Sequence, residues 1–334
     1  MMRFRYSRAC ILIAALLAFG SGAGAQSAAA ANYPNRVITI VAPFSAGGDS
    51  DLAARNVAQA APAYLGQPVI VVNKPGASGA IGSAYVKDAK PDGYTLLLAR
   101  VGSQAVIPAL TRNPPYRWND FTFLGLLELN PFVCAVKGDS AIRTLADLAG
   151  AIRDHPGKLN YSTTGVGTIL EMGPQMLFDI LKLGKEAAVQ IPYKGAAEAT
   201  AALLAGQVDF GCSNLATMLA LIRSGHLRAL VITTPERYKD IPGVPTAREA
   251  GYPQLELITG WSALYGPPGM DASLVARWRD ALQKISHDAD WIAGTEKIGS
   301  MPHILPPEET AKYVREQFET YERLGRTMGL ELKP

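Results

Sequence analysis

The chain has 334 residues, 48% of them hydrophobic, and its 32 basic and 29 acidic side chains give a formal charge of +3. This small surplus, without a basic stripe or clustered aromatic and basic residues, disfavours nucleic-acid binding. After residue 25, no stretch is apolar for long enough to form a transmembrane helix. The length instead suits a folded protein of two domains.

Residues 1–25 have the pattern of a secretory signal peptide. Three arginines precede an apolar run, Ile11–Phe19, that is too short to span a bilayer, and Ala23–Ala25 provides a small-residue cleavage site. Cleavage near Ala25 removes the three arginines and leaves 29 charges of each sign. Because Cys10 precedes the apolar run, where a lipid-anchor cysteine would follow it, we expect a soluble periplasmic protein. An uncleaved membrane anchor is the alternative.

Strand-like and helix-like runs alternate in the first part of the expected mature chain. The order is strand Val37–Ala42, helix Leu52–Tyr64, strand Pro68–Val72, helix Ala80–Ala89 and strand Tyr94–Ala99. This order favours a mainly parallel sheet with right-handed crossovers.

A second alternating series follows, and extended stretches at Phe123–Val136 and Glu256–Leu264 join it to the first. Two connections indicate that the chain passes into a second domain and returns, after which helices Ser273–Ser286 and Glu308–Gly325 complete the first. We therefore expect an α/β fold of two lobes, each a mainly parallel sheet flanked by helices, with two crossover strands as the hinge. Lobe 1 would contain residues 26–125 and 256–334, and lobe 2 residues 126–255. The second series comprises Leu145–Arg153, Leu159–Ser162, Gly167–Leu181, Val189–Pro192, Ala196–Ala205, Val208–Gly211, Leu215–Arg223 and Leu227–Ile232.

Two glycine-rich turns, Ala42–Asp51 and Asn160–Thr168, each connect a predicted strand to a predicted helix. Helix starts present unpaired N–H groups, so two such turns that face each other predict a clamp for a small polar or anionic molecule. In the first turn, Gly47 and Gly48 allow a ligand to approach the backbone closely. Asp51 either contacts the ligand or caps the following helix.

Three further segments contain candidate ligand contacts. Ser78 and Gly79 lie at the mouth of the expected cleft, or simply in a loop that leads to a helix. Tyr193 and Lys194 belong to a third strand-to-helix turn, at the edge where α/β sheets bind ligands, although Tyr193 equally suits packing between the domains. Asn214 joins the site or caps the next helix. The candidate ligand-binding residues are Phe44, Ala46, Gly47, Gly48, Asp51, Ser78, Gly79, Arg100, Ser103, Ser162, Thr163, Thr164, Gly165, Gly167, Thr168, Glu171, Tyr193, Lys194 and Asn214.

The sequence contains no recognisable catalytic or metal-binding motif. Its four histidines lack metal-ligand spacing, and there is no nucleophile elbow, P-loop or dinucleotide-binding pattern. We expect no enzymatic activity, no cofactor and no metal; a hydrolase assembled only in three dimensions is the alternative. Cys134 and Cys212 lie in apolar strand-like runs, where a disulfide and two buried thiols are both compatible with the pattern.

Over nearly its whole expected mature length, the chain resembles the extracytoplasmic solute receptors of the tripartite tricarboxylate transporter group, the Bug family. The resemblance implies a two-lobed, type II-like periplasmic binding protein that closes on one small carboxylate and delivers it to a membrane permease. The matching stretches are Tyr33-Pro34, Val37–Val41, Pro43–Asp51, Val72–Gly82, Pro91–Leu97, Pro192–Gly195, Gly206–Asp209, Gly225–Leu230, Pro245–Pro253 and Gly260–Pro268.

The resemblance also implies how the ligand is held and with which partners the receptor works. Backbone groups and hydroxyls of the two glycine-rich turns would hold the carboxylate. We expect a monomer that works with permease subunits, and a ligand-binding partner of a sensor kinase is the alternative.

The chain departs from the family pattern at two charged positions. Glu171 stands where relatives commonly have histidine, and Arg100 where they usually have a small polar residue. We expect Arg100 and Glu171 either to meet across the cleft or to recognise opposite ends of an amphoteric ligand; the alternative is that both point to solvent.

Overall fold

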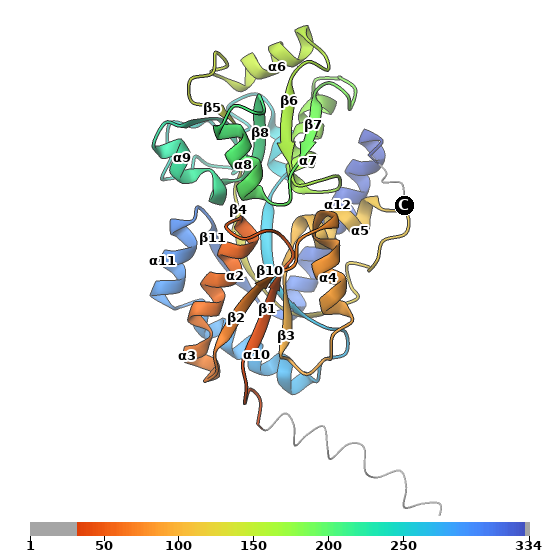
Figure 1. The fold of residues 1–334 in the computed structure, drawn as a ribbon, viewed down its shortest axis with the longest axis vertical. Coiled ribbons are helices and arrows are strands. Elements are labelled where there is room, and N and C mark those ends of the chain that lie inside the picture. Colours follow the sequence, from red (N-terminus) through yellow and green to blue (C-terminus); the bar gives the residue numbers. More distant parts are fainter. Residues whose placement is uncertain (1–31, 331–334) are drawn as a thin grey trace, which may run out of the picture.

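Figure 1 shows a computed structural model of the protein, which describes residues 32–330 as two lobes stacked along the long axis. The predicted signal peptide, residues 1–25, lies outside the described residues. Within the described range, the helices are too short or too polar to cross a membrane.

Lobe 1 is built on a six-stranded sheet with the order β11-β4-β10-β3-β1-β2. Strand β1 (Ile38–Ala42) pairs in parallel with β2 (Val69–Asn73) and β3 (Thr95–Arg100), as the alternating order predicts. Strand β10 (Gly260–Gly266) runs antiparallel between β3 and β4 (Thr122–Asn130), and β11 (Met301–Leu305) is antiparallel to β4. The expectation of a mainly parallel sheet is therefore wrong: the sheet is mixed, because the returning chain inserts antiparallel to the first strands.

Helices surround this sheet and bury its apolar side chains. The fully buried Trp278 on α10, together with Leu96 and Leu98 of β3, belongs to one core cluster of the lobe. Helix α11 and strand β11 have no counterpart in the sequence prediction. The helical segments are α2 (Asp49–Ala60), α3 (Pro62–Leu65), α4 (Ala80–Lys87), α5 (Ile107–Leu110), α10 (Ala272–Ile285), α11 (Ala289–Lys297) and α12 (Pro307–Met328), with a 3₁₀ turn at Ala77–Gly79 and a π-helical turn at Gly102–Val106.

Lobe 2 contains a five-stranded sheet with the order β7-β6-β8-β5-β9. This sheet is also mixed: β6 is parallel to β7 and β8, and β5 is antiparallel to β8 and β9. The strands are β5 (Phe132–Lys137), β6 (Asn160–Thr163), β7 (Val189–Pro192), β8 (Phe210–Asn214) and β9 (Leu227–Ile232), and the helices are α6 (Leu145–Asp154), α7 (Ile169–Ile180), α8 (Ala196–Leu204) and α9 (Leu219–Arg223), with 3₁₀ turns at Leu215–Thr217 and Pro253–Leu257.

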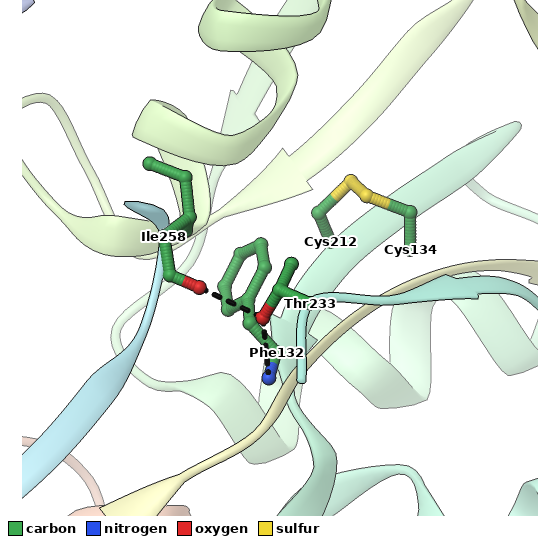
Figure 2. The surroundings of a disulfide bond; sticks show 5 residues. All are labelled: Phe132, Cys134, Cys212, Thr233 and Ile258. Atoms are coloured by element: carbon green, nitrogen blue, oxygen red, sulfur yellow. Dashed lines mark hydrogen bonds between the residues drawn. A yellow bond between two sulfur atoms is a disulfide. The ribbon is translucent and has the colours of Figure 1, made fainter. Parts of the chain in front are cut away.

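The two connections between the sheets meet at one buried hydroxyl. The expected boundary between residues 125 and 126 falls inside β4, which stays in the first sheet up to Asn130. On the return path, the Thr233 hydroxyl donates to the Ile258 carbonyl at 2.8 Å and accepts the Phe132 N–H at 3.3 Å (Figure 2). Thr233 therefore links the outgoing connection to the returning one.

Beside this hinge, Cys134 and Cys212 form a disulfide with an S–S distance of 2.03 Å (Figure 2). The two residues face each other in the register of β5 and β8, and their Cα atoms lie 4.0 Å apart. The question that the sequence left open is thus answered in favour of the disulfide, which joins two neighbouring strands of lobe 2.

Candidate functional site: a cavity between the lobes

A small cavity of about 20 Å³ lies where the two lobes meet, a volume close to that needed by one water molecule. Both glycine-rich turns reach it, which is the arrangement that a clamp requires. Lobe 1 contributes Phe44, Asp49, Arg100, Val101 and Gly102, and lobe 2 contributes Thr164, Thr168, Ile169, Leu170, Ala196 and Asn214.

Three helices, α2, α7 and α8, begin at this cavity. Their N-cap residues are Gly48, Thr168 and Gly195, and none of the three makes a side-chain capping hydrogen bond. The first N–H groups of a helix have no partner within the helix, and the helix dipole adds positive charge at that end. The helix starts thus give the cavity a backbone environment that favours anions.

Each of these helices also has an acidic residue in its first turn that folds back on the preceding loop. Asp51 accepts the Gly47 N–H at 2.9 Å, Glu171 accepts the Gly167 N–H at 2.6 Å, and Glu198 accepts the Lys194 N–H at 3.2 Å. In all three pairs the acid lies four residues after its donor. These carboxylates therefore hold the three turns in shape, and Asp51 does so through the loop before α2 and not by capping an N–H group of the helix.

Asp51 and Glu171 differ in how the protein shifts their pKa values. Burial alone would raise the pKa of Asp51, but hydrogen bonds from Arg55, Gly47 and Asn73 outweigh it and lower the pKa below its ordinary value. For Glu171, burial prevails over the Gly167 hydrogen bond and raises the pKa.

The prediction that Arg100 meets Glu171 is wrong. Arg100 Nη2 forms a 2.5 Å ion pair with Asp49, and its Nη1 lies 3.9 Å from Glu128. Glu171 is engaged with its own turn and faces a separate hollow of about 210 Å³, which Gln175 and Lys185 also line. Both predicted residues are buried, so the solvent alternative is wrong as well.

The sheet register explains why Arg100 has these neighbours. Ser262 of β10 pairs with Arg100 of β3 on one side and with Glu128 of β4 on the other. The Ser262 hydroxyl accepts a hydrogen bond from Arg100 and donates one to Glu128 at 2.8 Å. Burial raises the pKa of Glu128, against the opposing effect of the Arg100 charge. Arg100 thus lies between Asp49 at the cavity and Glu128 behind it.

Direct contacts hold the lobes together around the cavity. The Asn214 side-chain amide of lobe 2 donates to the Asp49 carboxylate of lobe 1. At the edge, the Ser78 hydroxyl donates to the Val166 carbonyl at 2.8 Å. Gly195 lies so close to Ser45 that a Cβ atom at this position would overlap the serine hydroxyl. These contacts hold the lobes together around space for about one water molecule, so a carboxylate ligand requires the lobes to move apart.

The structure brings five of the predicted ligand-binding residues to the cavity wall: Phe44, Arg100, Thr164, Thr168 and Asn214. The others lie in the surrounding turns or behind them. Thr163 accepts the Gly165 N–H, the buried Ser103 lies next to Gly79, and Ser162 is buried against Gly211. Ala46, Gly47 and Lys194 are exposed, and Tyr193 packs partly against the core of lobe 2. Ligand contact by any of the predicted residues, at the cavity wall or behind it, remains a prediction.

Sequence reasoning missed Asp49, Ser262 and Glu128. The available signal was a polar or charged residue inside an apolar strand, as for Glu128 in LGLLELN and Ser262 in GWSALYG. Across residues 32–330, no cluster of three or more His, Cys, Asp or Glu side chains is arranged to hold a metal ion.

Comparison with known proteins decides the family. The model of the tripartite tricarboxylate transporter family receptor, TctC, matches residues 53–330. The chain belongs to this family. The TctC family consists of solute-binding receptors of the periplasmic type, so this TctC receptor is a binding protein and not an enzyme, as the sequence predicted.

Solved structures of relatives confirm the two-lobed α/β fold. The periplasmic binding protein BugD is 31% identical with a TM-score of 0.84, over 90% of this chain and 100% of BugD. MatC from Rhodopseudomonas palustris, solved with bound malate, is 29% identical with a TM-score of 0.81, over 87% of this chain and 99% of MatC. Rpa4515 from R. palustris, solved with adipate, is 26% identical with a TM-score of 0.85, over 90% of this chain and 100% of that protein.

Proposed function

We propose that this TctC receptor is exported, clamps one small organic acid between its lobes and delivers it to the permease subunits of a tripartite transporter. The observation that carries the proposal is the convergence of three helix starts without side-chain caps, those of α2, α7 and α8, on one cavity between the lobes. Such helix starts bind carboxylates through backbone N–H groups and the helix dipole. MatC with malate and Rpa4515 with adipate support the same ligand class.

Thermal unfolding of the chain without residues 1–25 tests the binding step. A compound that binds only the folded receptor raises its stability by RT ln(1 + [L]/Kd), so a true ligand among organic acids raises Tm in proportion to the logarithm of its concentration. Small-angle scattering with and without that compound then reports lobe closure. A panel of mono-, di- and amino-carboxylates that leaves Tm unchanged would contradict the proposal, as would chemical conversion of the bound compound.

Delivery and export need separate measurements. Cross-linking in membranes that contain the cognate permease should join the ligand-loaded receptor to a permease subunit, with less product for the ligand-free receptor. N-terminal sequencing of the secreted protein should begin close to Gln26 if the predicted signal peptide is cleaved. An intact N-terminus in the periplasmic fraction would contradict cleavage.

A further inference from the structure

We infer that Asp49 makes the receptor selective for a ligand that has both a carboxylate and a protonated amine. The amine faces Asp49 in lobe 1, and the carboxylate faces the starts of α7 and α8 in lobe 2. This inference rests on the proposed function and narrows its ligand class from organic acids to amino-carboxylates.

The charges at the cavity are the first reason. Among the described residues that line it, only Asp49 and Arg100 are charged, and they pair with each other at 2.5 Å. Glu128 lies behind Arg100, at 3.9 Å from its guanidinium group. One guanidinium therefore faces two carboxylates, and the side chains that line the cavity in lobe 1 offer a ligand no uncompensated positive charge.

This pairing acts against a second ligand carboxylate. A carboxylate that binds Arg100 has to share its guanidinium group with the buried Asp49 and Glu128, and both carboxylates repel it. An ammonium group instead adds a second cation to a cluster with two acids and makes charge-assisted hydrogen bonds to Asp49. The full negative charge of Asp49 exceeds the partial positive charge of the α2 start, so lobe 1 favours an amine over a carboxylate next to Asp49.

Asn214 shows that Asp49 accepts N–H groups from lobe 2. Its amide nitrogen donates to Asp49, and its Oδ1 atom is buried with no hydrogen-bond partner among the described residues. This oxygen lies against Gly260 of β10, so Asn214 takes part in the site through its N–H group, and Asp49 is the acceptor there.

Lobe 2 has the opposite character. Its lining residues are uncharged, two of them, Thr164 and Thr168, carry hydroxyls, and the starts of α7 and α8 are without side-chain caps. The nearby Glu171 directs its carboxylate to the Gly167 N–H of its own turn. A ligand carboxylate therefore finds backbone donors in lobe 2 without an opposing acid aimed at it.

The test compares ligands that differ only at one end. Succinate, 4-aminobutyrate and 1,4-diaminobutane form one matched set, and adipate, 6-aminohexanoate and 1,6-diaminohexane form a longer one. α-Amino acids with two to six carbons extend the panel. Affinities are measured by titration calorimetry on the wild-type chain and on Asp49→Asn, which keeps the side-chain shape and removes the charge. Asp92→Asn, at the exposed Arg36–Asp92 pair, is the control for net charge.

In the wild-type chain, we expect the best amino-carboxylate to bind about tenfold or more tightly than any dicarboxylate of the same length. Asp49→Asn should weaken the amino-carboxylate and strengthen the dicarboxylate, while Asp92→Asn changes neither. Tighter binding of dicarboxylates to the wild-type chain would overturn the inference and leave the proposed function intact. Binding by no member of the panel would overturn both. The wild-type comparison needs no variant, so it decides the question even if Asp49→Asn does not fold.

Discussion

Gly195 of lobe 2 lies directly against Ser45 of lobe 1, so a Cβ atom at position 195 would overlap the Ser45 hydroxyl where it now stands. Its backbone is extended, with φ −163° and ψ 164°, a conformation that any residue adopts. The requirement for glycine at this position thus comes from the approach of the other lobe and not from the turn itself.

Gly195→Ala should therefore hinder closure and leave each lobe folded. We expect ligand affinity to fall about tenfold, because the added Cβ overlaps the Ser45 hydroxyl only when the lobes meet. Titration calorimetry gives the affinity, and small-angle scattering gives the shape with ligand. Removing the obstructing side chain in a Ser45→Gly background should restore part of the loss. Equal losses in both backgrounds would show that the contact is not the cause.

Asp51→Asn should destabilise the receptor in a pH-dependent way. The pKa of Asp51 is lowered in the folded protein, so its stabilising effect is present above the unfolded pKa of about 3.9 and is lost as the pH falls through the folded pKa. We expect the variant to be less stable by about 1 kcal/mol at pH 7, with a smaller difference at pH 3. Urea unfolding between pH 3 and pH 7 measures the difference in unfolding free energy between the variant and the wild-type chain. A difference that does not change with pH would contradict the prediction.

Glu171→Gln should show the opposite trend. Burial raises the pKa of Glu171 in the folded protein, so its charged form costs stability above the folded pKa, and that cost disappears as the pH falls below the unfolded value. Relative to the Gln variant, the wild-type chain should therefore gain stability as the solution becomes more acidic. The same urea experiment tests this, and parallel behaviour of Asp51→Asn and Glu171→Gln would show that the two assigned environments are wrong.

The disulfide should contribute strongly to the stability of lobe 2. Cys134 and Cys212 are separated by 78 positions in the chain, so their bond constrains a long loop of the unfolded state. The double substitution to serine should lower the free energy of unfolding by about 2–5 kcal/mol. Calorimetry with and without dithiothreitol provides the check: the wild-type chain should lose stability on reduction, and the serine variant should not respond.

Thr233→Val should weaken the hinge. Valine matches the shape of threonine, but it leaves the Ile258 carbonyl and the Phe132 N–H without the hydroxyl that joins them. We expect a loss of about 1–3 kcal/mol in unfolding free energy and a wider range of lobe orientations by small-angle scattering. Thr233→Ser retains the hydroxyl and should stay close to the wild-type chain. If Ser and Val behave alike, the hydroxyl does not link the two connections.

Local patterns predicted much of the fold. The first strands and helices were placed because apolar runs and helical spacing are properties of neighbouring residues. Strand β11, with the sequence MPHIL, contains no apolar alternation that marks a strand, and the antiparallel insertion of β10 depends on pairings with segments more than a hundred residues away. Sequence spacing carries little information about such non-local pairing.

The cavity was predicted less completely, for a related reason. The turn contains two acids, Asp49 and Asp51, and the sequence does not show which one points back at its own loop and which one faces the other lobe. The two acids take different roles because α2 begins at Asp49, and the sequence does not fix this starting residue. Arg100 was recognised as unusual, but its partner Glu128 comes into reach through Ser262, on a strand that lies far away in the sequence.

The position of β10 also has a consequence for how the receptor folds. All five strands of lobe 2 come from residues 132–232, whereas the sheet of lobe 1 needs β10 to fill the place between β3 and β4. As the chain emerges with its N-terminus first, β3 keeps an unpaired edge until residue 266 is available and β4 until residue 305. Unpaired edges favour aggregation. Lobe 2 is thus able to fold first, and the first lobe to emerge is the last to be completed.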